Sequence, residues 1–139
     1  MEKQTTAWKF FSWNTLWVIL ISCIVNASVW IGFHGIPLMG LPRKEAVESI
    51  TLLYNGTEER TVTDKEKVEL LVKSANLLNY QLGGETKGSP VITITYFLKN
   101  GKSVSIEANA TTVWWKGKAY ALKETEVFVN VIQGLFFTR

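Results

Sequence analysis

Apolar residues follow two different patterns along the chain, and the change falls near residue 34. Residues 10–33 contain no Asp, Glu, Lys or Arg, whereas charged residues recur regularly from Arg43 onward. The 24 residues of this uncharged stretch would form a helix about 36 Å long, which exceeds the ~30 Å hydrocarbon core of a bilayer. We therefore predict a transmembrane helix or signal anchor over residues 10–33.

The residues that flank the predicted span support this assignment. Aromatic residues, which favour the two membrane interfaces, stand toward both of its ends: Trp8, Trp13 and Trp17, then Trp30 and Phe33. Residues 1–9 form a short N-terminal tail. Residues 34–44 hold two glycines and two prolines, so the helix should end near His34 and a short linker should follow.

The basic residues around the span bear on its orientation. Lys3, Lys9 and the α-amine precede it, and Arg43 and Lys44 follow it, so the two sides nearly balance. A short basic tail ahead of a single span favours a cytoplasmic N-terminus. We expect a single-pass protein of the cell membrane with an extracytoplasmic C-terminal domain.

A second interpretation of the same stretch stays open. Leu20-Ile21-Ser22-Cys23 matches the pattern of a bacterial lipoprotein signal, in which cleavage before the cysteine follows its lipidation. Cys23 is thus a lipidation candidate. The apolar run continues for ten residues past Cys23, however, where a processed lipoprotein usually has a polar tether. We favour Cys23 as an ordinary residue of a membrane helix, and either interpretation leaves the domain tethered.

Residues 45–139 carry the signals of a compact domain. Alternation over residues 50–54 predicts a strand, Asn55-Gly56 a hairpin turn, and residues 59–62 the returning strand. Thr63 and Glu66 form the pattern of a capping box at the start of a helix over about 64–78. The apolar stripe of this helix recurs at helical spacing: Val68, Leu71, Val72, Ala75 and Leu78.

The second half of the domain repeats the hairpin pattern. Residues 91–98 are the clearest strand, and a turn at 99–102 leads to a returning strand at 103–106. A third strand pair spans 112–115 and 118–122 around a turn at Lys116-Gly117. Lys123-Glu124-Thr125-Glu126 places acids in the first turn of a closing helix that ends near Phe136.

These elements define an α+β fold with the order β-β-α-β-β-β-β-α. Hairpin connections make the sheet mainly antiparallel, and two amphipathic helices should cover one of its faces. The opposite face should be wettable because it carries small hydroxyl side chains: Thr51, Thr93, Thr95, Ser103 and Ser105.

Charge and composition exclude several classes of function. The net charge is +3, and from Arg43 onward 13 Lys and Arg are interspersed with 11 Asp and Glu, so the one-sign stripe that nucleic acids require is missing. The single cysteine excludes an intrachain disulfide, which points to a bacterial surface or a reducing compartment. Asn26, Asn55 and Asn109 begin glycosylation sequons, which keep a eukaryotic origin open.

The sequence also offers little catalytic chemistry. His34 is the only histidine and Asp64 the only aspartate, so we expect neither a metal site nor a cofactor. Glu107 and either Glu124 or Glu126 could form a carboxylate pair, but near neighbours arise by chance among eleven acids. We expect a non-catalytic domain.

The segment from Thr112 to Tyr120 is the best candidate for ligand binding. Trp114 and Trp115 are adjacent on a predicted strand, so their side chains must point to opposite faces. One can enter the core, and the other can lie on the hydroxyl-bearing face beside further candidates: Lys116, Lys118 and Tyr120. The alternative is that both tryptophans cover core or rim, since single exposed aromatic residues are common.

The arrangement of residues 48–136 resembles small Gram-positive extracytoplasmic domains of unknown function, found as lipoproteins or behind one membrane span. The resemblance rests on ESITLLYNG, TVTDKEKVELLVKSANLL, VITITYFLKNGKSVSI and WWKGKAYAL ahead of a final helix. It implies an extracytoplasmic location and no known catalytic residues. The long apolar run after Cys23 departs from the lipoprotein members.

Two functions follow as hypotheses. The first is a membrane-tethered binding or sensing module for an unknown protein, peptide or glycan partner, acting through the open sheet face or the Trp115 region. The second is an accessory subunit whose membrane helix docks on a larger membrane complex through small or polar residues: Ser22, Asn26, Ala27 and Ser28.

Overall fold

The computed structural model describes residues 12–138 and separates the chain into two compact units that meet between His34 and Gly35. The predicted tail, residues 1–9, and the first two residues of the predicted span lie outside the described part. In the first unit, helix α1 (Trp13–His34) ends at His34, where the glycine and proline signals placed its end.

Helix α1 is long and apolar enough to cross a membrane, judged by length and composition. It has 22 residues, none of them buried, and its most apolar 18-residue stretch has a mean hydropathy of 2.1. Its polar side chains bond to the backbone of the preceding turn. Asn26 Nδ2 donates to the Ser22 carbonyl at 2.8 Å, and Ser28 Oγ donates to the Ile24 carbonyl at 2.8 Å. Such local bonds reduce the cost of placing a polar group in an apolar medium.

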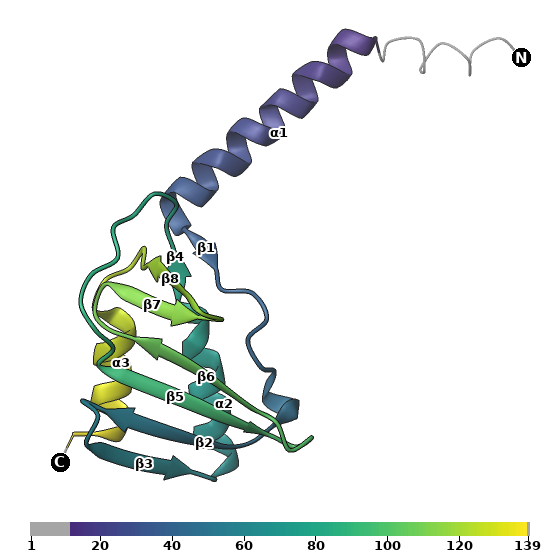
Figure 1. Ribbon diagram of the computed structural model, residues 1–139. Helices are drawn as coiled ribbons and strands as arrows, with labels where there is room; N and C mark the ends of the chain where they lie inside the picture. Colours follow the sequence, from purple (N-terminus) through teal and green to yellow (C-terminus); the bar gives the residue numbers. More distant parts are fainter. Residues whose placement is uncertain (1–11, 139) are drawn as a thin grey trace, which may run out of the picture. The chain divides into compact units, whose positions relative to one another are not determined.

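The second unit is built on a six-stranded antiparallel sheet with the strand order β3-β2-β5-β6-β7-β8 (Figure 1). Its strands are β2 (Val47–Tyr54), β3 (Glu58–Val62), β5 (Ile92–Leu98), β6 (Ser103–Ala108), β7 (Thr112–Trp115) and β8 (Lys118–Ala121). The predicted α+β class and antiparallel pairing are confirmed.

Two of the predicted hairpin turns have the backbone geometry that their sequences require. Asn55 and Gly56 have φ values of 51° and 70°, and Lys116 and Gly117 have 50° and 74°. Two consecutive residues with positive φ define a type I′ turn, whose twist matches that of the flanking strands. Asparagine and glycine adopt this geometry readily, whereas Lys116 adopts it at some cost.

The two helices of this unit start slightly later than the sequence predicted. Helix α2 (Lys65–Ser74) continues into a 3-10 turn, η3 (Ala75–Leu77). Its N-cap is Asp64 and not Thr63, because Asp64 Oδ1 accepts the Lys67 backbone N–H at 3.0 Å. The capping box predicted from Thr63 and Glu66 is therefore wrong by one residue.

Helix α3 (Val127–Phe136) also lacks the acidic first turn that we predicted. Glu124 and Glu126 precede the helix, and Glu126 is in the left-handed region with φ 67°. The Glu126 backbone N–H donates to the Ala110 carbonyl at 2.7 Å, which fixes this sharp turn beside the sheet. The helix therefore begins only at Val127, after the turn. The predicted end at Phe136 is confirmed.

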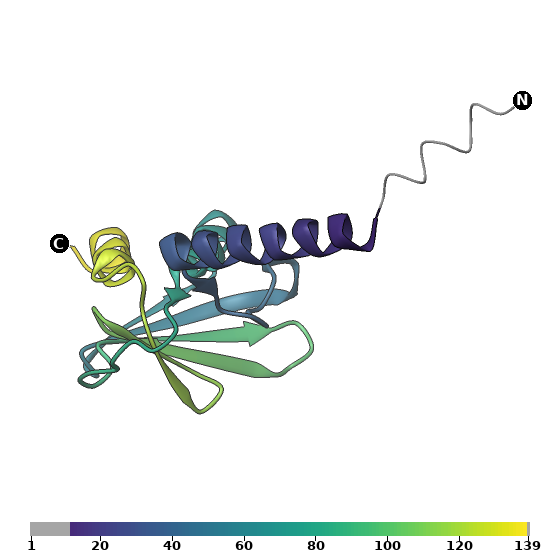
Figure 2. The same ribbon diagram turned by 90° about the horizontal axis from the view of Figure 1, so that it is seen from above.

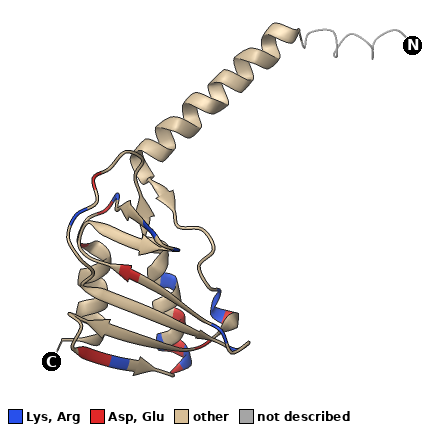
Figure 3. Cartoon of the chain, viewed as in Figure 1, with Lys and Arg blue, Asp and Glu red and all other residues tan. Residues whose placement is uncertain are grey.

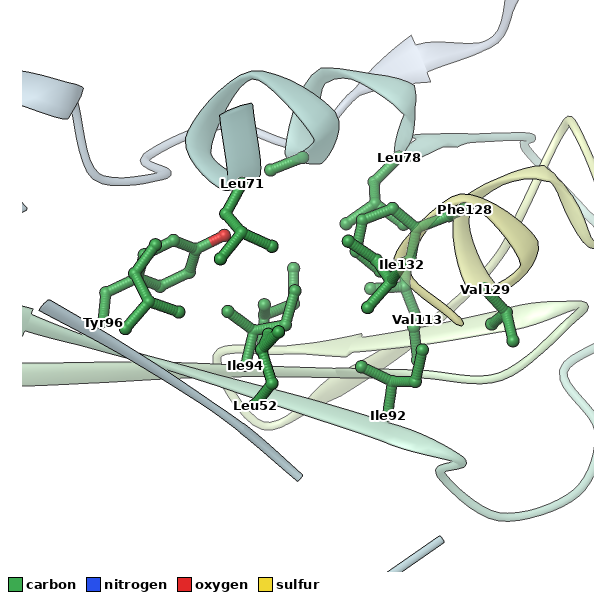
Figure 4. Close-up of a cluster of buried hydrophobic side chains, with 14 of the residues drawn as sticks. Leu52, Leu71, Leu78, Ile92, Ile94, Tyr96, Val113, Phe128, Val129 and Ile132 are labelled. Atoms are coloured by element: carbon green, nitrogen blue, oxygen red, sulfur yellow. The ribbon is translucent and has the colours of Figure 1, made fainter. Parts of the chain in front are cut away.

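The core lies between the sheet and these two helices, which lie on the same side of it (Figure 2). Inward side chains of successive strands alternate with outward ones, and Leu52, Ile94 and Ile106 are at most 1% exposed. They meet Leu71 from α2 and Ile132 from α3 in one apolar cluster (Figure 4). Burial of this kind contributes roughly 25 cal/mol per Å² and is the main source of stability.

The segment that we predicted as a linker, residues 34–44, is largely part of the folded unit. Strand β1 (Ile36–Pro37) pairs with β4 (Asn79–Tyr80), and both short strands were missed by the sequence reading. Leu38 is buried at 8% exposure, and a 3-10 turn, η2 (Lys44–Ala46), leads into β2. The compact unit therefore begins at Gly35, ten residues before the predicted boundary at residue 45.

A long loop, residues 81–90, is fixed to the sheet through Asn109. Asn109 Nδ2 donates to the carbonyls of Lys87 at 2.8 Å and Ser89 at 3.1 Å, and its Oδ1 accepts the backbone N–H groups of Thr111 and Thr112. Asn109 is buried, and both hydrogens of its amide are in use. The sequon at Asn109 is thus inaccessible to glycosylation in the folded domain.

The free edge of the sheet at β3 is protected by charge. Glu58, Glu59 and Arg60 are all exposed on this outermost strand (Figure 3). Charged side chains on an edge strand disfavour pairing with another chain. The other edge, β8, is partly covered, because Tyr80 forms a bridge with Leu122 and the Gln81 N–H donates to the Ala121 carbonyl.

Candidate binding surface

The sheet face that points away from α2 and α3 is the main candidate surface, and its composition follows from the strand register. One row across the sheet consists of hydroxyl residues, because Thr51 is opposite Thr61 and Thr95, and Thr95 is opposite Ser105. The Thr95 and Ser105 side-chain oxygens are 3.0 Å apart, and those of Thr51 and Thr61 are 3.5 Å apart. This face is wettable, as predicted.

Trp114 lies in the next row of the same face. It is opposite Glu107 on β6, and Glu107 is opposite Thr93 on β5. The Trp114 side chain is half-buried, so part of its ring remains open to solvent. A partly exposed indole beside a carboxylate and hydroxyl groups can stack on a ligand while its neighbours form hydrogen bonds.

Trp115 has the opposite orientation and belongs to the core. It is 4% exposed, and its Nε1 donates to the Met39 carbonyl at 3.0 Å. This bond ties β7 to Met39 in the segment that follows β1, and adds to the β1–β4 pairing that holds this segment on the domain. The interpretation of the Trp115 region as a ligand surface is therefore replaced by a structural one, and Trp114 is the tryptophan on the open face.

The other three sequence candidates surround the β7–β8 turn. Lys116 Nζ lies 5.4 Å from the centroid of the Trp115 ring, within the range of a cation–π interaction. Lys118 is exposed at the start of β8. Tyr120 is half-buried, and its ring is 4.8 Å from that of Tyr80. Lys116 and Tyr120 thus have structural neighbours on the domain itself, and only Lys118 is a fully exposed side chain without a close partner that the structure describes.

Cys23 lies in the middle of α1 and is exposed as a free thiol. The helix continues without a break through Cys23 to His34. The residues between Cys23 and His34 are therefore helical and do not form an extended tether.

The open face also carries two groups that were not among the ligand-binding residues predicted from the sequence. Phe97 is 43% exposed and lies opposite Ser103, so a second aromatic ring belongs to this face. Glu107 is half-buried beside Trp114. Alternation over residues 91–98 puts Phe97 on this face, but the pairing of Glu107 with Trp114 depends on the register across the three-residue connection 109–111.

A separate cavity of about 570 Å³ lies between η2, the start of α2 and the β5–β6 turn. Its lining mixes three lysines and three glutamates with apolar side chains, so it has no net charge of its own: Lys44, Lys65, Lys99, Glu45, Glu48, Glu69, Thr63, Val47 and Val68. Lysines and acids are interspersed over this whole region (Figure 3). Such a balanced lining gives no preference for an anionic or a cationic ligand.

Glu69, in the wall of this cavity, forms ion pairs with two lysines. Its Oε1 is 2.8 Å from Lys73 Nζ and 3.0 Å from Lys44 Nζ. Hydrogen bonds from Lys73 and Lys44, with the charges of both lysines, lower the pKa of Glu69 to about 2. The hydrogen bond and charge of Glu69 raise the pKa of Lys44 in turn. The Lys44–Glu69 contact connects η2 to α2, whereas the Lys73–Glu69 contact lies within α2.

The structure also places three further titratable groups: Tyr96, Glu124 and Glu126. Tyr96 is 1% exposed under α2, its hydroxyl has no hydrogen-bond partner among the described residues, and burial raises its pKa. Glu124 and Glu126, which we considered as partners of Glu107, are both exposed in the turn before α3. Within residues 12–138, no group of three or more metal-ligating side chains comes together.

Comparison of the chain with protein-family models, curated proteins and solved structures gives no match. Function must therefore be inferred from the open sheet face and α1.

The opposite orientations of the two tryptophans predict opposite effects of truncation. We expect Trp115→Ala to lower the free energy of unfolding by about 3–5 kcal/mol, because it removes a buried ring and leaves the Met39 carbonyl without its donor. Trp114→Ala should cost only about 1 kcal/mol. Urea unfolding of the full chain in detergent, followed by circular dichroism, measures both. Equal losses would contradict the assignment of Trp114 to the open face.

The position of Glu69 predicts a specific pH dependence. The folded-state pKa of Glu69 is about 2, below its ordinary value of 4.5, so the carboxylate stabilises the fold above pH 4.5 and this contribution is lost as the pH falls toward 2. We expect Glu69→Gln to lower the melting temperature slightly at pH 7 and to match the parent chain near pH 2. Glu48→Gln, an exposed glutamate in the same cavity lining, is the control and should show no such convergence.

Proposed function

We propose that this protein is a non-catalytic, membrane-tethered binding module whose ligand surface is the open face of the sheet around Trp114. The single observation that carries this proposal is the row in which a half-buried Trp114 lies opposite Glu107, beside a row of hydroxyl side chains on the face that α2 and α3 leave open.

The tether in this proposal is α1, retained without cleavage. An exposed, predominantly apolar helix of 22 residues is unfavourable in water and favourable in a bilayer. The basic tail that precedes it supports a cytoplasmic N-terminus and an extracytoplasmic domain. The resemblance to small Gram-positive extracytoplasmic domains is in line with this orientation, and the uninterrupted helix after Cys23 favours an intact anchor over a lipidated one.

The chemistry of the surface favours a neutral ligand that is rich in hydrogen-bonding groups. Hydroxyl side chains both donate and accept hydrogen bonds, and the Trp114 ring offers an apolar platform for stacking. The Glu107 carboxylate beside Trp114 disfavours an anionic ligand such as a lipid headgroup. Glycan strands and extended peptides fit these requirements.

An accessory-subunit role is the second candidate, and Asn26 is the observation in its favour. The Asn26 amide nitrogen bonds to Ser22 within α1, but its carbonyl oxygen has no partner among the described residues. A free acceptor in the middle of a membrane span can bond to a second helix. This role predicts that a partner contacts α1, whereas the binding-module role predicts contact at the open face.

Intact-mass measurement of the membrane fraction tests the tether. We expect the full chain of 15.7 kDa, with residues 1–22 present and no acyl group on Cys23. Cys23→Ser should leave both the mass pattern and the membrane fractionation unchanged, because the proposed anchor is the helix and not a lipid. A chain that begins at an acylated Cys23 would contradict an uncleaved anchor.

Site-specific photocrosslinking in intact cells tests the ligand surface. A benzophenone side chain at position 114 should capture a glycan or peptide ligand, because it replaces the central ring of the proposed surface. The matched control is position 70 on α2, where Leu70 is 43% exposed but lies on the helical side of the domain. Equal capture from both positions would contradict the proposal, and capture only from position 26 would favour the accessory-subunit role.

A further inference from the structure

The folded domain begins immediately after α1, without a flexible spacer. Gly35 follows His34 directly and is buried, with φ at +77°. A Cβ at this position would lie 2.9 Å from Lys123 Cβ and 2.9 Å from the Tyr80 carbonyl oxygen, so only glycine fits. Ile36 and Pro37 then pair with β4. The first three residues after the helix are therefore fixed within the domain.

This short connection determines which part of the domain lies near the membrane if α1 spans it, as proposed above. The polar headgroup layer extends about 5–8 Å beyond each side of the hydrocarbon core. Because Gly35 directly follows α1, a residue in contact with Gly35 must lie within the length of one or two residues from the end of α1. The surface around Gly35 must then lie at the level of the lipid headgroups.

Four side chains form this surface, which we call the proximal rim: Tyr80, Leu82, Tyr120 and Lys123. Lys123 and Tyr80 flank Gly35, and the Lys123 backbone N–H donates to the Asn79 carbonyl at 2.7 Å. The Tyr80 and Tyr120 rings are 4.8 Å apart. Leu82 follows two residues after Tyr80 and is 74% exposed, next to the backbone hydrogen bond that Gln81 N–H donates to the Ala121 carbonyl.

We propose that the proximal rim rests on the lipid surface and binds anionic headgroups, so that the domain is held in a fixed orientation and does not swing on its anchor. This inference rests on the proposed function of α1 as a membrane tether. Tyrosine rings favour the headgroup region, an exposed leucine gains free energy by entering the acyl boundary, and a lysine near the surface is attracted to anionic lipids. The rim combines all three chemistries around the point where the chain leaves α1.

The test uses the full chain with an environment-sensitive NBD fluorophore at position 82, introduced as Leu82→Cys in a Cys23→Ser background. The matched control is Lys102→Cys with the same fluorophore, in the β5–β6 turn that lies well away from β1 and β4 in Figure 1. Each protein is reconstituted into vesicles of phosphatidylcholine and phosphatidylglycerol, or of phosphatidylcholine alone, with a nitroxide-labelled lipid as quencher.

We expect blue-shifted emission and lipid quenching at position 82, and neither at position 102. Quenching at position 82 should be stronger in the vesicles with phosphatidylglycerol, and Lys123→Glu should remove that difference. Equal quenching in both lipids would overturn the binding of anionic headgroups, and no quenching at position 82 would overturn the whole inference.

The failure of this inference is distinguishable from the failure of the tether. If position 82 is unquenched while the protein stays with the vesicles in alkaline carbonate, the proximal rim does not touch lipid but α1 still anchors the chain. If the protein leaves the vesicles in carbonate, the tether itself is wrong.

Discussion

The strand register across β2, β5 and β6 is the constraint on which the rest of the domain depends. Because side chains alternate between the two faces, one register places Leu52, Ile94 and Ile106 under the helices and Thr51, Thr95 and Ser105 on the open face. A slip of one residue would bury the hydroxyl row and expose the core. The same pairing therefore determines both which side chains form the core and which side chains form the open face.

The sequence predicted the elements whose signals are local. Alternation over residues 91–98, the glycine turns at Asn55-Gly56 and Lys116-Gly117, and the apolar stripe of α2 each report on a few adjacent residues. Strands β1 and β4 were missed because each has two residues, too short for any period to show. Glycine and proline near residues 35–42 suggested a linker, but they shape a segment that long-range contacts with Trp115 and Leu78 hold in place.

The candidate surface was predictable only in part, for the same reason. Adjacent tryptophans on a strand must point to opposite faces, and alternation with Thr112 and Val113 could have indicated that Trp115 is the inner one. Its hydrogen bond to Met39 spans 76 positions in sequence and leaves no local signal. The pairing of Trp114 with Glu107, which gives the open face its chemical character, depends likewise on the register between β6 and β7.

The order of strands carries a consequence for where a ligand must be. β8 is the edge nearest to Gly35, and β3 is the opposite edge, five inter-strand spacings or about 24 Å away (Figure 1). Trp114 lies on β7, one strand in from the near edge. If the proximal rim rests on the lipid surface, as proposed, a molecule that stacks on Trp114 would be held on the part of the sheet next to that rim, one strand spacing of about 4.8 Å in from β8. A binding module of the proposed kind would then reach ligands that lie along the membrane more readily than polymers held further out.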